Sequence, residues 1–196
     1  MNAGKSTTLL QSSYNYRERG MDTILFTPAV DDRYGVGKIT SRIGLGSDAV
    51  PFNDDLDFYE YTKHFVDNNT HNLACVLLDE AQFITKDQVQ QLTDIAHDIG
   101  VPVLAYGLRT GYNAEPFEGS KYLLSWADEL IEIKTICHCG RKATMTMLVD
   151  ENGKQVKDGP TVVIGGNEKY VSTCLKHYKL GVPGPLQLNL GENDNH

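Results

Sequence analysis

The pattern of hydrophobic and polar residues divides the first two thirds of the chain into alternating strands and helices. Continuous apolar runs are typical of strands buried on both faces, and they predict strands at DTILFT (22–27), LACVLLD (73–79), VPVLAYG (101–107) and ELIEIKT (129–135). Apolar residues at helical spacing predict helices over 6–19, 54–67, 86–99 and 119–126. Strands that alternate with helices predict an α/β fold with a mostly parallel sheet.

The pattern changes after residue 135. The segment RKATMTMLVDENGKQV predicts a hairpin, because Asn152-Gly153 is a strong signal for a two-residue type I′ turn. This region is too small to build its own core, so a metal would be a reasonable means of stabilising it. The glycine-dotted segment 35–46 is predicted to be a mobile loop, and the residues from Gly181 onward a poorly ordered tail.

Composition narrows the classes of function. The chain has 196 residues and a net charge of −8, which argues against a surface that binds the nucleic-acid backbone but not against binding a single nucleotide. No apolar run reaches the roughly 18 to 20 residues of a membrane helix, and the N-terminus does not resemble a secretory signal. We therefore expect a cytoplasmic protein with neither nucleic-acid nor membrane partners.

Two short motifs predict a nucleotide site. The opening MNAGKSTTLL matches the end of a G-x-x-x-x-G-K-[ST] phosphate-binding loop, with Gly4, Lys5 and Ser6 in the last three positions. Taken alone, a GKS sequence is equally well explained as the start of a helix that binds no ligand. LLDEAQF (77–83) strengthens the nucleotide interpretation, because Asp79 at the end of an apolar strand can hold magnesium together with Ser6, while Lys5 reaches the outer phosphates.

Glu80 lies next to the metal-side acid and needs a separate role. Its carboxylate can act as a general base on the group that attacks the γ-phosphate of ATP. That group is either water, in an ATPase, or a substrate hydroxyl, in a kinase. The two adjacent carboxylates do not distinguish these cases.

Cysteine and histidine spacing predicts a zinc site in the last third of the chain. Cys137 and Cys139 are followed, 35 residues later, by Cys174 and His177, and the latter pair has ordinary zinc-ligand spacing. The alternative is four buried side chains without a metal. His138 could replace a cysteine but is interpreted as a bystander, and Cys75 as a core residue.

Between the two pairs of predicted ligands lies VVIGGNEKY (162–170). Its adjacent glycines would let the backbone approach a flat ligand, and Tyr170 offers a ring and a hydroxyl. A plain turn explains this stretch equally well.

The motifs NAGKST, DDRYG, LLDEAQF, YGLRTGY, CHCG-RKA and VIGGNEKYVSTCLKHY occur in the order found in type II thymidine kinases, and the bacterial branch is especially similar. The resemblance extends from Met1 to about Tyr178. It implies a RecA-like phosphate-loop domain (1–134), a zinc-held lasso domain (135–180), a disordered tail (181–196) and a homotetramer. It also implies transfer of the ATP γ-phosphoryl to the 5′-hydroxyl of thymidine or deoxyuridine, with magnesium, in pyrimidine salvage, and feedback inhibition by dTTP.

The resemblance also implies roles for individual residues. Glu80 would be the catalytic base. The ATP-binding positions would be Asn2, Ala3, Gly4, Lys5, Ser6, Thr7, Asp31, Arg33, Asp79, Glu80, Ala81 and Gln82. The thymidine-binding positions would be Tyr112, Phe117, Thr161, Val162, Val163, Ile164, Gly165 and Tyr170. The zinc ligands would be Cys137, Cys139, Cys174 and His177.

One departure from the family pattern is the N-terminus, because family members have a strand and the first part of the loop before the position of Met1. A misplaced start is the favoured explanation and a shortened gene product the alternative. In either case the chain as written is expected to fold poorly and to bind ATP weakly. Three other interpretations remain open: a nucleic-acid-stimulated ATPase, a non-catalytic zinc module, and a catalytically impaired zinc-binding remnant of the kinase.

Overall fold

The computed structural model describes residues 3–30, 35–41, 43–69, 72–159 and 170–184. The chain forms two compact units. The large unit contains Asn2–Gly111 and Glu115–Ile133, and the small unit contains Met1, Tyr112–Ala114 and Lys134–His196. Each unit is described by itself below.

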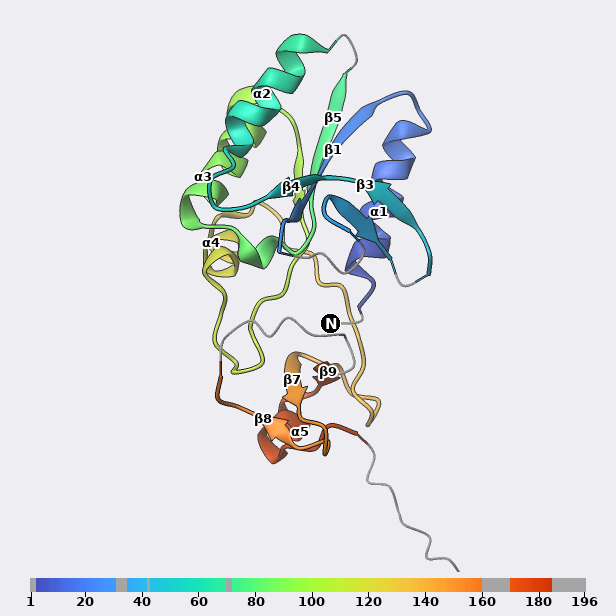
Figure 1. The fold of residues 1–196 in the computed structure, drawn as a ribbon, viewed down its shortest axis with the longest axis vertical. Coiled ribbons are helices and arrows are strands. Elements are labelled where there is room, and N and C mark those ends of the chain that lie inside the picture. Colours follow the sequence, from blue (N-terminus) through green and yellow to red (C-terminus); the bar gives the residue numbers. More distant parts are fainter. Residues whose placement is uncertain (1–2, 31–34, 42, 70–71, 160–169, 185–196) are drawn as a thin grey trace, which may run out of the picture. The chain divides into compact units, whose positions relative to one another are not determined.

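The large unit is built on a four-stranded sheet (Figure 1). Its strands lie in the order β4 (Val50–Phe52), β1 (Asp22–Pro28), β5 (Leu73–Leu78) and β6 (Val103–Ala105). All three strand pairings are parallel. The predicted α/β fold with a mostly parallel sheet is therefore confirmed, and the strand ends that precede Asp79 and Tyr106 meet at the same edge of the sheet.

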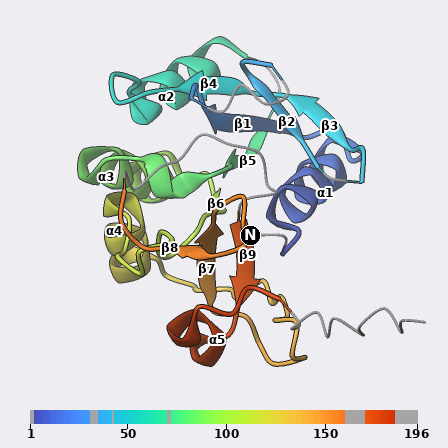
Figure 2. The same cartoon turned by 60° about the horizontal axis from the view of Figure 1, so that its bottom comes forward.

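Helices cover both faces of this sheet, and Figure 2 shows α1 (Lys5–Arg17) on one side of it and α2 (Phe58–Asn68) and α3 (Lys86–Asp94) on the other. Alternate side chains of each strand point to opposite faces. One face packs Leu25, Cys75 and Leu77 with Leu9 and Leu10 of α1. The other packs Ile24, Phe26, Val76 and Leu78 with Phe58, Val89 and Leu92. This two-sided burial explains why β1 and β5 are continuous apolar runs in the sequence.

Helix α3 begins with a capping box, and one residue of this box also holds the loop that precedes α2. The Thr85 hydroxyl accepts a hydrogen bond from the backbone amide of Gln88, whose side-chain oxygen accepts one from the amide of Thr85. The side-chain nitrogen of Gln88 (Nε2) donates hydrogen bonds to the backbone carbonyls of Asn53 and Leu56. A π-helical turn, η2 (Ile95–Ile99), follows α3, so the predicted helix over 86–99 is present with a change of geometry. The last helix of this unit is α4 (Glu118–Trp126).

Two predictions for the large unit are wrong. The run at 129–135 forms no strand, and Leu130 and Ile131 are 62% and 74% exposed. An apolar run becomes a strand only beside a partner strand, and among the described residues β6 pairs with β5 alone. The predicted loop at 35–46 contains β2 (Lys38–Thr40), which pairs with β3 (Gly46–Asp48) because Ile39 is buried against the α1 side of the core.

The small unit has a three-stranded antiparallel sheet and one short helix. Its strands lie in the order β8 (Gln155–Val156), β7 (Met145–Val149) and β9 (Tyr170–Thr173), and α5 (Leu175–Leu180) follows β9. Its buried cluster consists of Met147, Val149 and Tyr178. Tyr178 also donates a hydrogen bond from its hydroxyl to the carbonyl of Tyr112 at 2.7 Å.

The hairpin between β7 and β8 is present, but its turn is not type I′. A type I′ turn needs a positive φ at both central residues, and Gly153 has one (φ 74°) whereas Asn152 does not. The side chain of Asp150 accepts hydrogen bonds from the amides of Asn152 and Lys154, which fixes a longer turn with glycine in the left-handed position.

No helix in the described part of the chain is both long and apolar enough to cross a membrane. Of the predicted tail, residues 181–184 are described and 185–196 lie outside the described residues.

Candidate nucleotide and metal sites

The start of α1 has the geometry of an anion-binding helix end. Gly4 caps the helix with a left-handed backbone (φ 80°, ψ 22°), a conformation that strongly favours glycine. The first turn carries no acidic residue, and its free amides together with the helix dipole favour a negatively charged ligand. Lys5 is the first residue of this helix, so its ammonium group adds positive charge there.

Ser6 and Asp79 connect this helix to the end of β5. The Ser6 hydroxyl donates a hydrogen bond to one carboxylate oxygen of Asp79 at 2.8 Å. The other oxygen accepts the backbone amide of Glu80 at 3.0 Å. The two side chains that the sequence predicts to hold magnesium therefore lie in contact. Their chemistry fits that ion, because Mg²⁺ prefers oxygen ligands such as hydroxyl and carboxylate groups.

Asp79 is 5% exposed, and the pKa of its carboxyl is raised from 3.8 to about 6, mainly because of this burial. The neighbouring charge of Glu80 contributes to this increase in pKa, whereas the hydrogen bond from Ser6 and the charge of Lys5 oppose it. A positive charge next to Asp79, such as a bound cation, would stabilise the ionised form of this carboxyl.

Glu80 adopts a backbone conformation that is rare for its residue type. Its φ of 47° and ψ of 43° lie in the left-handed region, and the short 3-10 helix η1 (Ala81–Phe83) follows directly. Its carboxylate is half-buried and accepts a hydrogen bond from the side-chain amide of Gln82 at 2.6 Å. Strain of this kind persists only where the surrounding structure enforces it, and it is concentrated at functional sites.

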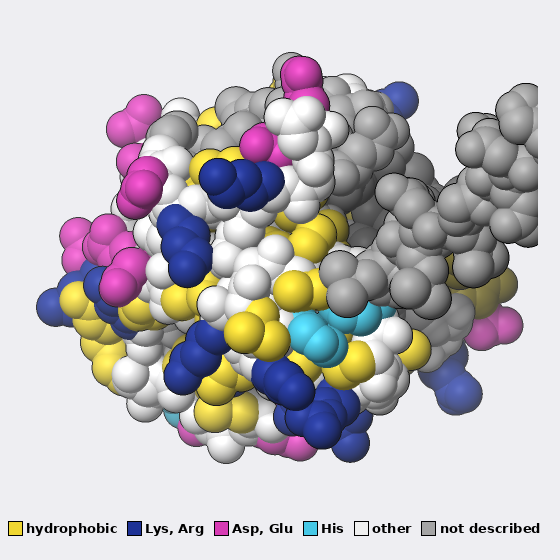
Figure 3. All heavy atoms as spheres, turned by 90° about the horizontal axis from the view of Figure 1, so that it is seen from below, with side chains coloured by type: hydrophobic (Ala, Val, Ile, Leu, Met, Phe, Trp, Pro, Cys, Tyr) yellow, Lys and Arg dark blue, Asp and Glu magenta, His cyan; other side chains and the backbone are white. Residues whose placement is uncertain are grey.

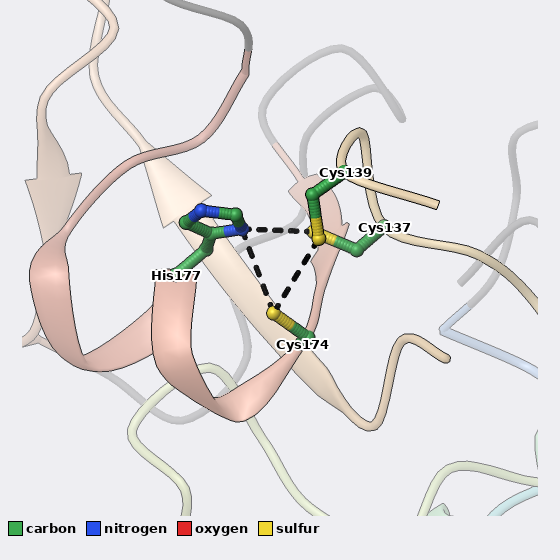
Figure 4. A group of neighbouring side chains, drawn as sticks. All are labelled: Cys137, Cys139, Cys174 and His177. Carbon is green, nitrogen blue, oxygen red and sulfur yellow. Dashed lines mark hydrogen bonds between the residues drawn. The ribbon is translucent and has the colours of Figure 1, made fainter. Parts of the chain in front are cut away.

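The four predicted metal ligands lie together in the small unit (Figure 4). Their ligand atoms, from Cys137, Cys139, Cys174 and His177, all lie within 4.8 Å of one another. The sulfur of Cys139 is 3.9 Å from that of Cys174, and the His177 Nδ1 atom lies 3.4 Å and 3.5 Å from the sulfurs of Cys137 and Cys174. Tetrahedral zinc, with Zn–S bonds of about 2.3 Å, separates its ligand atoms by about 3.8 Å, so the group fits zinc.

Local turns bring these ligands together. A tight turn between Cys137 and Arg141, with Gly140 at φ 79°, turns two cysteines toward one point. Cys174 caps α5, and His177 lies almost one turn further along the same helix. Burial raises the pKa of the Cys137 thiol, but the backbone amides of Cys139 and Cys174 and the His177 side chain outweigh this and lower it to about 6. The thiolate is the form that binds metal.

His138 lies next to the group formed by the four predicted ligands, and its Nδ1 atom is 3.5 Å from the sulfur of Cys137. Its ring stacks on that of His177 with centroids 4.3 Å apart. On the face seen in Figure 3, histidine side chains are exposed right of the centre, next to hydrophobic ones. Cys75, the remaining cysteine, is fully buried in β5, as the sequence predicted.

Comparison with known proteins identifies the family of the chain. A family profile described as thymidine kinase matches residues 1–178. The chain belongs to the thymidine kinase family. A thymidine kinase of Legionella pneumophila (strain Paris) is 61% identical over 184 residues, which are 94% of this chain and 88% of the relative. A thymidine kinase of Aliivibrio fischeri is 59% identical over 91% of the chain and 92% of the relative, and one of Coxiella burnetii is 55% identical over 93% of each.

The structure places some of the site residues implied by the thymidine kinase resemblance and leaves others undescribed. Gly4, Lys5, Ser6, Asp79 and Glu80 lie at one end of the sheet of the large unit, with Ala3 and Thr7 next to them in sequence and Ala81 and Gln82 buried just behind Glu80. Eight implied positions lie outside the described residues: Asn2, Asp31, Arg33, Thr161, Val162, Val163, Ile164 and Gly165.

The aromatic residues predicted to surround thymine fall into different units. Tyr112 is buried in the small unit, where its ring centroid is 6.5 Å from that of Tyr170. Phe117 caps α4 in the large unit and packs edge-on against Phe83 at 5.8 Å. Their grouping around one ligand stays a prediction.

Sequence reasoning missed the residues that support Glu80 from behind. The backbone amide of Leu108 donates to the Gln82 side-chain oxygen at 3.0 Å, and the Ser120 hydroxyl donates to the carbonyl of Leu108 at 2.5 Å. No local sequence signal indicates these contacts, because residues 26 and 12 positions apart make them.

Proposed function

We propose that the protein transfers the γ-phosphoryl group of ATP to the 5′-hydroxyl of thymidine, giving thymidine monophosphate and ADP. The observation that carries this proposal is the identity of 55% to 61% with thymidine kinases over more than nine tenths of the chain. The contact between Ser6 and Asp79, with Glu80 adjacent, supports it structurally.

In this proposal the phosphates of ATP bind at the start of α1. The backbone amides after Gly4 would donate to the phosphate oxygens, and Lys5 would pair with the outer phosphates. Ser6 and Asp79 would hold Mg²⁺, which when bound offsets the negative charge of the phosphates. Asp31 and Arg33 are proposed to lie near the same phosphates, where the guanidinium would neutralise charge that develops during transfer.

Glu80 is proposed as the general base. Its carboxylate would accept the proton of the 5′-hydroxyl as the hydroxyl oxygen forms its bond to the γ-phosphorus and the bond to the bridging oxygen of ADP breaks. Its half-buried position leaves its carboxylate partly accessible to solvent and substrate.

Thymidine is proposed to bind through backbone groups of 161–165, with Tyr112, Phe117 and Tyr170 around the ring. A site whose paired polar groups match the base rejects ligands that would leave those groups unpaired. Deoxyuridine, which shares these polar groups, is proposed as a second substrate.

Zinc is proposed to have a structural role, joining the 137–139 turn to the start of α5. A lasso domain over 135–180 on a phosphate-loop domain over 1–134, a homotetramer, inhibition by dTTP and a cytoplasmic location belong to the same proposal, and each rests on the family resemblance.

The test is thymidine-dependent release of ADP with ATP and magnesium. It is run on the 196-residue chain and on a version extended upstream with the corresponding residues of the Legionella pneumophila relative. Glu80→Gln is expected to lower kcat by about 10²- to 10⁴-fold, because it removes the base but keeps the size of the side chain. Glu60→Gln, an exposed acid on α2, is the control and is expected to retain the full rate.

Other outcomes identify the alternatives. Release of ADP that DNA or RNA stimulates and thymidine does not would indicate a nucleic-acid-dependent ATPase. A protein that binds one zinc ion per chain but turns over no thymidine in either version would indicate a non-catalytic zinc-binding protein. Wild-type turnover by Glu80→Gln would disprove the role of Glu80 as base.

A further inference from the structure

We propose that Gln82 is a positioning residue, which holds the carboxylate of Glu80 in its reactive orientation and itself contacts neither substrate. This inference rests on the proposed role of Glu80 as general base. It departs from the role that the family resemblance implies for Gln82, which is direct binding of ATP.

The side chain of Gln82 bridges two groups inside the large unit. It is 3% exposed. Its nitrogen donates to a carboxylate oxygen of Glu80 at 2.6 Å, and its oxygen accepts the backbone amide of Leu108 at 3.0 Å. Both polar ends of the amide are therefore paired with groups of the protein, and one of them is the proposed base.

The Leu108 end of this bridge is itself fixed. The Leu108 carbonyl accepts a hydrogen bond from the buried hydroxyl of Ser120. Two residues earlier, Tyr106 is paired with both Leu78 and Ala81 through backbone hydrogen bonds of 2.8 Å and 2.9 Å. The segment that carries Leu108 is therefore held at Tyr106 by backbone bonds and at Leu108 by Ser120, which supports the Gln82 amide.

Close packing around Gly107 shows that this support leaves no spare room. A Cβ atom added at Gly107 would lie 3.0 Å from both the backbone nitrogen and the side-chain oxygen of Gln82. The backbone of 107 therefore lies directly against Gln82. The side-chain amide of Gln82 is thus held in one orientation, in which its nitrogen donates to Glu80.

The carboxylate of Glu80 needs the hydrogen bond from Gln82, because the backbone of Glu80 does not fix the orientation of its side chain. The left-handed conformation at φ 47° is unfavourable for a glutamate, and its side chain is only half-buried. A charge-assisted hydrogen bond from a rigid donor fixes the carboxylate at one position. A misplacement of about 1 Å at a reacting group can lower a rate by about 10²-fold.

The experiment compares Gln82→Met with Gln88→Met in the form of the enzyme that turns over thymidine. Both glutamines are buried, at 3% and 2% exposed, and the side chain of each hydrogen-bonds at least one backbone group. Gln82→Met is expected to lower kcat by about 10- to 100-fold with the KM values for ATP and thymidine changed by less than about 2-fold. Gln88→Met is expected to keep kcat within about 2-fold, because the side chain of Gln88 hydrogen-bonds the backbone of Asn53, Leu56 and Thr85 and not the carboxylate of Glu80.

A double-mutant cycle with Glu80→Gln tests whether Gln82 acts through Glu80. If it does, Gln82→Met has no further effect on kcat in the Glu80→Gln background.

Two results would overturn the proposal. One is a full additional loss of kcat in the Glu80→Gln background. The other is a raised KM for ATP with kcat retained in the Gln82→Met single variant, which would indicate that Gln82 binds ATP directly. If Glu80→Gln alone keeps the wild-type kcat, it is the base assignment that fails. If Glu80→Gln is inactive and Gln82→Met is fully active, only the positioning role fails.

A second variant covers the case in which Gln82→Met does not fold. Gln82→Glu keeps the oxygen that accepts the amide of Leu108 and removes the donor to Glu80. At alkaline pH, where the introduced carboxyl is ionised, it is expected to lose kcat by about 10-fold or more while its melting temperature stays above the assay temperature. An unchanged kcat in that variant contradicts the proposal.

Discussion

The large unit and the small unit bury apolar side chains to very different extents. The large unit packs Phe26, Phe58 and their neighbours on one face of its sheet and Leu9, Leu10 and Leu77 on the other. In the described part of the small unit, the buried hydrophobic cluster consists of Met147, Val149 and Tyr178. Burial drives folding roughly in proportion to the apolar area removed from water. The large unit therefore has a core of its own, whereas the small unit is expected to depend on the proposed zinc site.

Loss of the proposed zinc site is expected to have the largest effect on stability. It should unfold the small unit and leave the large unit folded. Structural zinc contributes about 10–16 kcal/mol in zinc-finger peptides, so Cys174→Ser should unfold the small unit while the sheet of the large unit stays protected from hydrogen exchange. Cys75→Ala is the matched control, because Cys75 is a buried cysteine outside the metal group. It is expected to keep one zinc ion per chain. Retention of β7 and β9 protection in the zinc-free Cys174→Ser protein would contradict the comparison.

A core mutation in the large unit is expected to have the next largest effect. Phe26 is fully buried, and its ring packs edge-on against Phe58 at 4.8 Å and Tyr61 at 5.4 Å. Phe26→Ala should lower the free energy of unfolding of the large unit by about 3–5 kcal/mol, measured by urea denaturation. Tyr14→Ala, at a position that is 59% exposed, should change it by less than about 0.5 kcal/mol. Zinc content should be the same in both variants.

The smallest expected effect concerns the pH dependence of the large unit. The folded pKa of Asp79, about 6, lies above its ordinary value of 3.8, so the folded state binds the proton more tightly than the unfolded state. Asp79 therefore costs stability progressively as pH rises from about 4 to 6, by up to about 3 kcal/mol above pH 6. Asp79→Asn should be more stable than wild type by up to that amount at neutral pH and equally stable below about pH 4, without magnesium or nucleotide.

Thermal melts of Asp79→Asn and of Asp54→Asn, an exposed control, across this pH range measure the difference. An Asp79→Asn protein that is less stable than wild type at neutral pH would show that the hydrogen bond from Ser6 outweighs the cost of burial. The small unit should respond to neither variant.

Most of the fold of the large unit could be predicted because burial leaves a periodic signal. The apolar runs of β1 and β5 and the spaced apolar positions of α2 and α3 each reflect a face that packs against the sheet. The metal ligands could be predicted because two of the turns that assemble them are local, at 137–139 and 174–177. The strand predicted at 129–135 failed for the opposite reason, since strand formation depends on a partner that local sequence does not specify.

The sequence by itself determined the α/β class, the residues with phosphate-loop and zinc-ligand chemistry, and the resemblance to thymidine kinases, because these depend on residue type and short-range spacing. Only the tertiary structure decided that Ser6 contacts Asp79, that Glu80 has a left-handed backbone, and that the Gln82 amide joins Glu80 to Leu108. The physical reason is that these contacts join residues brought together by strand order and helix packing, and the energy that fixes them comes from many distant side chains acting together.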